Sequence, residues 1–125
     1  MTRVLVIDDD PELRQFLCES LEENGYSAEG EADGALGIRA YQRQPADIVL
    51  TDIVMPTKEG LETILEFRRR FPEATIIAMS GGLTAANYDP LPAARILGAQ
   101  HTLQKPFSVK EMLDLLSQIV SEAGK

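Results

Sequence analysis

Short strand-like runs alternate with segments of helical periodicity along the chain. The first, third and fourth runs are mainly apolar, as expected of buried strands, and the second is weaker because it contains two glutamates. The five runs are Arg3–Ile7, Ser27–Glu31, Ile48–Thr51, Thr75–Met79 and Thr102–Gln104. This pattern predicts five β-strands separated by helices.

The first and last predicted helices have clear start signals. Asp10 is a favoured N-cap residue, and Pro11 fits the first turn of a helix. Ser108 and Glu111 have the spacing of a capping box. An apolar stripe follows each start: Leu13, Phe16, Leu17 and Leu21 in the first helix, and Val109, Met112, Leu113, Leu116 and Val120 in the last. Both segments therefore predict amphipathic helices.

The other three helices are predicted from weaker signals: a stripe of Leu61, Ile64, Leu65 and Phe71, and the segments Gly34–Arg43 and Ala93–Leu97. Five strands alternating with five helices predict an α/β fold, with a parallel sheet covered on both faces and right-handed crossovers. The length of 125 residues suits one ordinary domain, and no repeat or linker-like stretch divides the chain. Residues 1–125 are therefore expected to form a single domain.

Composition narrows the possible partners. The net charge of −8 disfavours unaided binding to nucleic acid or to an anionic membrane, since both need a positive surface. No apolar run approaches the ~20 residues of a membrane span, and Val4–Ile7 is too short for a signal peptide. The single cysteine, Cys18, cannot form an internal disulfide and is expected to fill space in the first helix. We expect a cytoplasmic protein.

Residues that can carry chemistry stand at or just after the strand ends. In an open parallel sheet, the site lies beyond the carboxyl ends of the strands, where the strand order switches. With the order 2-1-3-4-5, strands one, three, four and five lie side by side. Five residues can then meet in one pocket: Asp8, Asp9, Asp52, Ser80 and Lys105.

These residue types suit a cation and a phosphoryl group. Consecutive aspartates in "VLVIDDDP" repel one another by about 1 kcal/mol per close pair even in water, and a divalent cation offsets that repulsion. Carboxylate oxygens are ligands that Mg²⁺ prefers. Lys105 adds a positive charge for phosphoryl oxygens, and Ser80 adds a hydroxyl. Asp52 can then act as a nucleophile toward a phosphoryl donor. Asp10 taken alone is better explained as a helix cap.

Five motifs stand in order along the chain: "VLVIDDD", "DGALGIRAYQRQPADIVLTDIVMPTKEG", "IIAMSG", "LGA" and "LQKPF". In this order and spacing the chain resembles the receiver domains of two-component response regulators, over nearly its whole length. The resemblance implies the flavodoxin-like receiver fold and a signalling domain that is not an enzyme, apart from assisting its own phosphorylation and dephosphorylation.

The resemblance also implies roles for individual residues. Asp8 and Asp9 would bind Mg²⁺, Asp52 would be the phosphoacceptor, and Val54 would lend its backbone carbonyl to the metal. Ser80 and Lys105 would contact the phosphoryl group, and Lys105-Pro106 would be a cis peptide bond, which is found at ~5% of X–Pro bonds.

The partners implied by the resemblance are proteins. The phosphoryl donor would be a sensor histidine kinase or a histidine phosphotransfer protein. A downstream protein target would bind the face formed by the fourth helix, the fifth strand and the fifth helix, with no direct contact to nucleic acid or membrane.

Two features depart from the family pattern. Receivers usually carry an aromatic switch residue three positions before the lysine, where this chain has Thr102. A threonine cannot exchange a ring between buried and exposed positions. The segment from Ser80 to Gly98 is also longer than usual, and its prolines are expected to shorten or displace the fourth helix. His101 is expected to be structural or at the surface rather than a metal ligand.

Two other functions fit part of the pattern. In haloacid-dehalogenase-type phosphatases, the first strand is followed by a nucleophilic aspartate and, two residues later, an acid/base aspartate. Asp8 and Asp10 have this spacing, although the chain is short for that fold. A receiver-like scaffold that is never phosphorylated would be marked by a missing acceptor or lysine, and both are present. A flavodoxin relative is a weaker match, because no Ser/Thr-rich phosphate loop follows the first strand.

Overall fold

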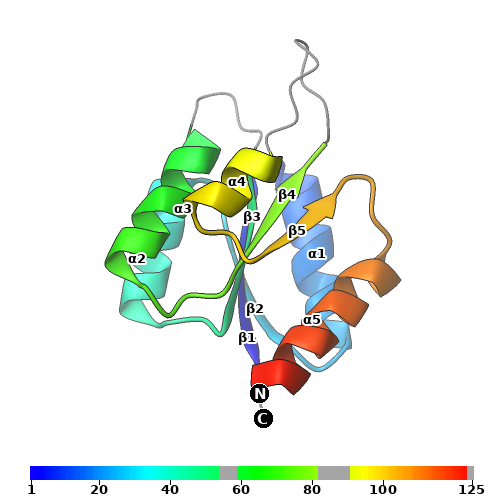
Figure 1. Cartoon of the computed structure of the whole chain (residues 1–125). Coiled ribbons are helices and arrows are strands. Elements are labelled where there is room, and N and C mark those ends of the chain that lie inside the picture. The colour runs from blue at the N-terminus through cyan, green and yellow to red at the C-terminus, as the bar shows by residue number, and fades with distance from the viewer. Residues whose placement is uncertain (54–58, 82–90, 124–125) are drawn as a thin grey trace.

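The computed structural model describes residues 1–53, 59–81 and 91–123. Strands and helices alternate from one end of the chain to the other, as predicted (Figure 1). The strands are β1 (Arg3–Ile7), β2 (Ser27–Glu31), β3 (Ile48–Asp52), β4 (Ile76–Ser80) and β5 (His101–Gln104). The helices are α1 (Pro11–Glu23), α2 (Gly34–Arg43), α3 (Glu59–Arg70), α4 (Leu91–Leu97) and α5 (Val109–Ala123).

The five strands form one parallel sheet in the order β2-β1-β3-β4-β5, which confirms the predicted topology. In the register, Ile7 is opposite Thr51 and Asp52 is opposite Met79. The strand order therefore switches between β1 and β3, and the carboxyl ends of these two strands are neighbours at one edge of the sheet.

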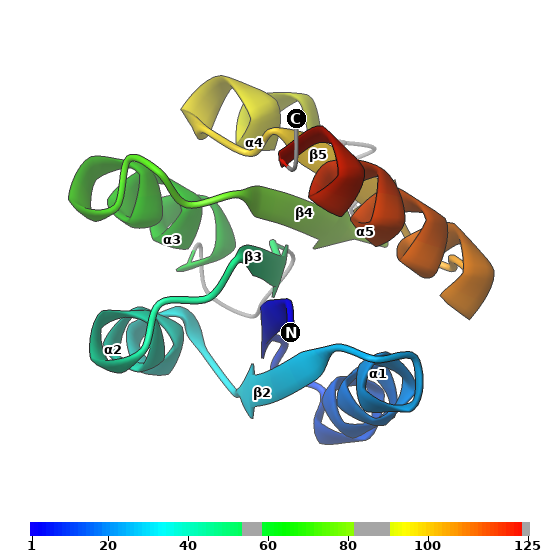
Figure 2. The ribbon, with the colours of Figure 1, turned by 90° about the horizontal axis from the view of Figure 1, so that it is seen from below.

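Helices cover both faces of the sheet. Seen from below, α2, α3 and α4 lie on one side, and α1 and α5 lie on the other (Figure 2). Alternate residues of β1 supply the two cores: Leu5 and Ile7 pack on the side of α2 and α3, while Val4 and Val6 pack on the side of α1 and α5. Because β1, β3 and β4 are buried on both faces, they read as nearly continuous apolar runs.

The predicted helix starts are confirmed. The Asp10 carboxylate accepts hydrogen bonds from the backbone N–H groups of Glu12 and Leu13, at 3.0 and 3.3 Å. The backbone N–H of Glu111 donates to Ser108 Oγ at 3.0 Å, as a capping box requires. These caps satisfy N–H groups that the first turn of a helix leaves without partners.

Element boundaries differ from the prediction by a residue or two. β3 and β4 run one residue further than expected, to Asp52 and Ser80, because backbone pairing with the next strand continues to these positions. In α3, Phe67 is fully buried like Ile64, although the predicted stripe did not include it. Phe71 lies after the helix, where its ring packs on Tyr41, with centroids 4.5 Å apart. In α1, Phe16 is 52% exposed rather than part of the buried stripe.

Arg68 lies in the last turn of α3 and binds the backbone of two neighbouring connections. Its guanidinium donates to the carbonyl oxygens of Pro72, Ala74 and Gly98, at 2.5, 2.9 and 2.8 Å. The reason is the close approach of the α4–β5 connection to the end of α3, which the sequence pattern alone does not reveal. Arg68 therefore joins the α3–β4 connection to the α4–β5 connection, at the edge of the sheet opposite the aspartates.

Candidate functional site

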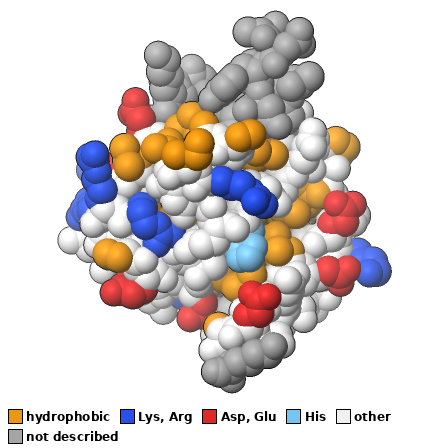
Figure 3. Space-filling model, viewed as in Figure 1, with side chains coloured by type: hydrophobic (Ala, Val, Ile, Leu, Met, Phe, Trp, Pro, Cys, Tyr) orange, Lys and Arg blue, Asp and Glu red, His pale blue; other side chains and the backbone are white. Residues whose placement is uncertain are grey.

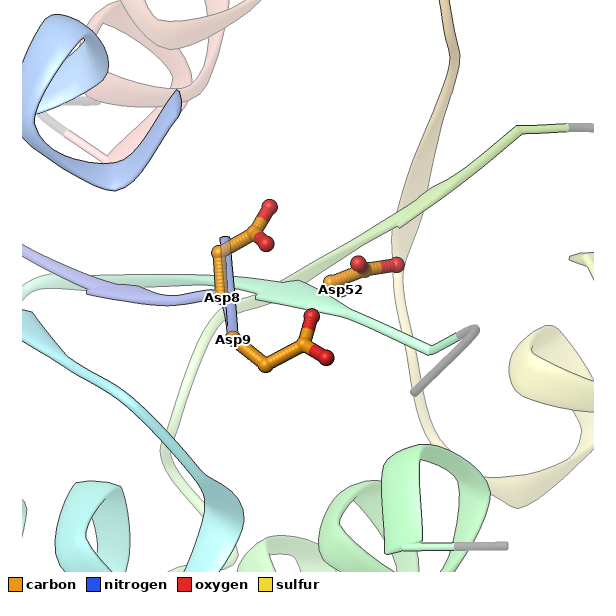
Figure 4. A group of neighbouring side chains, drawn as sticks. All are labelled: Asp8, Asp9 and Asp52. Atoms are coloured by element: carbon orange, nitrogen blue, oxygen red, sulfur yellow. The ribbon is translucent and has the colours of Figure 1, made fainter. Parts of the chain in front are cut away.

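The carboxyl edge of the sheet brings together the aspartates singled out by the sequence. Asp8 and Asp9 follow β1, and Asp52 is the last residue of β3. Each offers a carboxylate oxygen that lies within 4.8 Å of the other two (Figure 4). Asp8 and Asp52 are buried, with 0% and 4% of their surface exposed, whereas Asp9 is exposed. Two of the three carboxylates are therefore buried, and the group is open to solvent on the side of Asp9.

Lys105 joins the aspartates from the end of β5. Its ammonium lies 3.2 Å from a carboxylate oxygen of Asp8 and 3.2 Å from one of Asp52. Burial by itself would lower the pKa of Lys105, but the negative charges of Asp52 and Asp8 outweigh burial and raise that pKa above its ordinary value. Lys105 is therefore a fixed positive charge between two buried carboxylates. The Lys105-Pro106 peptide bond that follows is cis, as expected.

Asp8 has hydrogen bonds to several parts of the structure. Its backbone N–H donates to the carbonyl of Glu31 at 3.1 Å, and its carboxylate accepts from the N–H of Asp10 at 2.9 Å. Its own carbonyl accepts from Nη1 of Arg14 at 2.8 Å. Backbone and side chain of Asp8 are thus both fixed with respect to β2 and α1.

Asp10 lies outside this group of carboxylates. Its side chain caps α1, as described above, which is the structural role that the sequence favoured. The phosphatase hypothesis needs Asp10 as an acid/base beside Asp8. In the structure, the Asp10 carboxylate is instead directed to the first N–H groups of the helix.

The remaining candidates lie around the same edge. Ser80 ends β4 and is fully buried, and its carbonyl accepts a 2.6 Å hydrogen bond from the backbone N–H of Lys105. Thr102 is half-buried in β5 and pairs with Ala78 of β4. His101, at the start of β5, is also half-buried and lies at the other end of that strand from Lys105. Val54 and most of the Gly81–Ala94 segment lie outside the described residues.

The donor set fits Mg²⁺. The ligands within reach are carboxylate oxygens, and Mg²⁺ prefers oxygen ligands, typically one or two carboxylates completed by water and phosphate oxygens. Asp8, Asp9 and Asp52 could bind the ion, with exposed Asp9 at the side where water has access. The same ion would relieve the repulsion among three carboxylates that only one nearby ammonium offsets among the described residues.

Comparison with known proteins identifies the family. A family model described as the response regulator receiver domain matches residues 4–117. The chain belongs to this family. Receiver domains are signalling domains rather than conventional enzymes, and the acidic cluster of this receiver domain lies at the family's phosphorylation site.

Curated relatives of this receiver domain include one that it matches over its full length. It is 29% identical over 123 residues to the response regulator receiver protein CpdR of Brucella abortus, covering 98% of this chain and 100% of CpdR. It is 32% identical over 122 residues to the transcriptional regulatory protein PdtaR of Mycobacterium tuberculosis, covering 95% of this chain but only 57% of PdtaR.

Solved structures agree with the fold. A CheY-like receiver domain from Methanospirillum hungatei superposes with a TM-score of 0.87 at 24% identity, covering 98% of this chain and 95% of that one. The response regulator TrrA of Thermotoga maritima, solved in complex with Mg²⁺-BeF, has a TM-score of 0.81 at 28% identity. That match covers 95% of this receiver domain and 99% of TrrA.

Two residues near the site were not singled out from the sequence. Arg14 donates to the backbone of Asp8, and its position four residues after the Asp10 cap is the signal that could have suggested a role at the start of α1. Gly60 was noted only as part of a family motif. A Cβ atom there would lie 2.3 Å from the Cα of Ile53, directly after Asp52. Both residues support the backbone that carries the aspartates.

Proposed function

We propose that this receiver domain accepts a phosphoryl group on Asp52 from a phosphohistidine donor, in a Mg²⁺-dependent reaction, and thereby changes which protein it binds. The observation that carries the proposal is the position of Asp52. Its carboxylate is buried at the end of β3, beside the Lys105 ammonium and within reach of both Asp8 and Asp9. Phosphoryl transfer to a carboxylate needs acidic side chains that hold a metal ion and a positive charge that stabilises the phosphoryl oxygens.

The chemical step is a displacement at phosphorus. A carboxylate oxygen of Asp52 attacks the phosphorus atom, and the bond between phosphorus and the donor imidazole nitrogen breaks. The electron pair leaves with that nitrogen, and because the other ring nitrogen of the donor carries a proton, the leaving group is neutral imidazole. Lys105 neutralises charge on the phosphoryl oxygens, and the Ser80 hydroxyl provides a hydrogen bond to them. When bound, Mg²⁺ screens the repulsion between the incoming phosphoryl group and the carboxylates. Asp8 and Asp9 are its proposed side-chain ligands with Asp52, and Val54 its proposed backbone ligand.

Similarity to TrrA supports the metal and the phosphoryl group. TrrA was solved with Mg²⁺-BeF, a combination of a divalent cation with a phosphoryl mimic. The present chain has three carboxylates and a lysine at the carboxyl edge of its sheet, a set that suits such a cation and phosphoryl group. We therefore assign Mg²⁺ as the cofactor of the reaction.

The proposed partners are proteins of a phosphorelay. The donor is a sensor histidine kinase or a histidine phosphotransfer protein, and the downstream target binds the face of α4, β5 and α5. On this face, hydrophobic side chains gather over α4, where Ile96 is 85% exposed (Figure 3). Thr102 lies in β5 of the same face and replaces the family's aromatic switch residue, so we expect Thr102→Ala to change signalling only modestly.

We propose a cytoplasmic location and a single receiver domain over residues 1–125. Within the described ranges, no helix is long and apolar enough to cross a membrane. The family match covers residues 4–117.

Phosphorylation of the intact protein tests the proposal. With Mg²⁺ and a small acyl-phosphate donor, intact-mass measurement should show one added phosphoryl group that hydroxylamine removes, as expected of an acyl phosphate. Asp52→Asn should prevent labelling, and a chelator should prevent it in the wild type. Asp114→Asn, at an exposed carboxylate of α5, is the matched control and should label normally.

Undiminished labelling of Asp52→Asn would exclude Asp52 as the acceptor. Turnover of a phosphate ester that is lost in Asp8→Asn would favour the phosphatase hypothesis instead.

A further inference from the structure

We propose that Arg14 is a positioning residue for the metal-binding turn formed by Asp8 and Asp9. Nη1 of Arg14 donates a 2.8 Å hydrogen bond to the backbone carbonyl of Asp8, six positions earlier in the chain. The inference rests on the proposed function, because it concerns the Mg²⁺ ligands assigned there. Arg14 touches the backbone of a ligand residue, so it acts through Asp8 rather than on the phosphoryl group.

The hydrogen bond fixes a part of Asp8 that its other contacts leave unrestrained. The N–H of Asp8 bonds to Glu31 of β2, and its carboxylate bonds to the Asp10 N–H and to the Lys105 ammonium. The carbonyl belongs to the peptide group that continues to Asp9. Rotation of that peptide group would change where the Asp9 carboxylate points. By bonding to this carbonyl, Arg14 fixes the orientation of the link between the two acidic ligands.

The path of the Arg14 side chain depends on Gly30 of β2. A Cβ atom at position 30 would lie 2.9 Å from Cγ and 3.1 Å from Cδ of Arg14. Contacts below 3.0 Å require something to move, and here the obstructed atoms are in the middle of the side chain rather than at its flexible end. Gly30 therefore provides the space through which the Arg14 stem passes between α1 and β2 to reach Asp8.

Loss of the Arg14 charge and loss of its hydrogen bond should have opposite effects on Mg²⁺ affinity. Arg14 is a cation near a site for a divalent cation, so removing its charge would by itself strengthen Mg²⁺ binding. Removing a hydrogen bond that orients the ligands would weaken binding. Loss of a partner that orients metal ligands commonly weakens affinity by about 10–100-fold. Because Arg14 contacts a backbone carbonyl rather than a ligand oxygen, we expect a loss of about threefold to tenfold.

The experiment measures Mg²⁺ affinity by isothermal titration calorimetry of the intact protein. Arg14→Met keeps most of the stem and removes the donor, Gly30→Ala obstructs the stem, and Arg14→Lys restores a shorter donor. The first two variants should bind Mg²⁺ more weakly than the wild type, and Arg14→Lys should lie between. Arg39→Met removes the same charge from an exposed position of α2 and should leave affinity unchanged or slightly strengthened. Gly30→Ala tests the same hydrogen bond if Arg14→Met folds poorly.

A second measurement needs no metal. The Asp10 N–H donates to the Asp8 carboxylate, so amide hydrogen exchange at Asp10 reports on the order of the turn. In metal-free protein, this exchange should be faster in Arg14→Met than in the wild type and unchanged in Arg39→Met. If the wild type binds Mg²⁺ and Arg14→Met binds it as tightly or more tightly, the inference is overturned and the proposed function stands. If the wild type binds no Mg²⁺, both are overturned.

Discussion

Nζ of Lys105 lies 3.2 Å from a carboxylate oxygen of Asp52, although the two residues are 53 positions apart in the chain. The contact extends across β4, which lies between β3 and β5 in the sheet. The same ammonium is 3.2 Å from Asp8 at the end of β1. One side chain therefore links the ends of three strands and offsets the charge of two buried carboxylates when no metal is bound.

Replacing Lys105 with methionine should destabilise the metal-free protein. The substitution leaves Asp8 and Asp52 buried side by side without the ammonium. We expect the free energy of unfolding to fall by about 2 kcal/mol, less than the ~3–5 kcal/mol typical of a broken buried pair, because 23% of the Lys105 side chain is exposed. Urea denaturation in the presence of a chelator measures this change. Lys110→Met, which removes an exposed lysine from α5, is the control and should have little effect.

Asp52→Asn should stabilise metal-free protein and weaken its response to Mg²⁺. The amide keeps the shape of the side chain and removes one of three neighbouring negative charges. Substitutions that remove repulsion from a functional site commonly raise the free energy of unfolding by ~0.5–2 kcal/mol. We expect an increase near the lower end of this range, because Lys105 already offsets part of the repulsion. Mg²⁺ at about tenfold above its Kd should add about 1.4 kcal/mol to the wild type and less to the variant. Denaturant melts with chelator and with Mg²⁺ at constant ionic strength test both parts. An Asp52→Asn protein that is less stable without metal, yet responds to Mg²⁺ like the wild type, would contradict this view of the acidic pocket.

Gly60→Ala should disturb the backbone beside the phosphoacceptor. The added Cβ would lie 2.3 Å from the Cα of Ile53 and 2.4 Å from its carbonyl oxygen, and backbone atoms cannot move aside as a flexible side chain can. Overpacking of this kind costs about 1–3 kcal/mol. Thermal unfolding should show the loss. Gly81→Ala is the matched control, since a Cβ at Gly81 meets nothing within 4 Å. Equal stability of the two variants would argue against close packing of α3 on the end of β3.

The Cys18 thiol should lose its proton at a higher pH than an exposed thiol and should react more slowly with alkylating reagents. Burial, with added repulsion from Glu22, raises the pKa of this thiol above its ordinary value of 9.0. Well below pH 9.0 the thiol is protonated in both the folded and unfolded states. As pH rises through that value, the unfolded state loses its proton first, so the folded protein loses stability. The free energy of unfolding should therefore fall more steeply with pH in the wild type than in Cys18→Ala. Alkylation of Cys18 should also be slower in folded than in urea-unfolded protein, and equal rates would contradict the prediction.

The sequence was sufficient to predict the fold and the grouping of the acidic residues. β1, β3 and β4 are buried on both faces, so each reads as an apolar run that can be found without a structure. Because the strands are parallel, polar residues at their carboxyl ends meet at one edge. That reasoning brought Asp8 and Asp52 together across more than forty positions of sequence, and the structure agrees. The roles of these residues in metal binding and phosphoryl transfer, and those of Val54, Ser80 and Lys105, remain predictions.

Contacts between elements were beyond the reach of the sequence. Arg14 and Arg68 both lie in helices, where an arginine is usually read as a solvated residue. Their hydrogen bonds depend on which loop or strand passes close by, and that depends on the packed structure. The absence of a side chain at Gly30 can be explained only from the structure, in which β2 lies against α1 and the Arg14 stem passes close to position 30.

The hydrogen bonds of Arg68 have a consequence for the mechanics of α4. A helix as short as Leu91–Leu97 has little stability of its own and depends on its attachments. Arg68 binds the carbonyl of Gly98, directly after the helix, and the carbonyl of Ala74, two residues before β4, so this end of α4 is anchored to the rest of the molecule. Loss of the Arg68 guanidinium would therefore release the Gly98 end of α4 from α3 and from the segment that leads into β4.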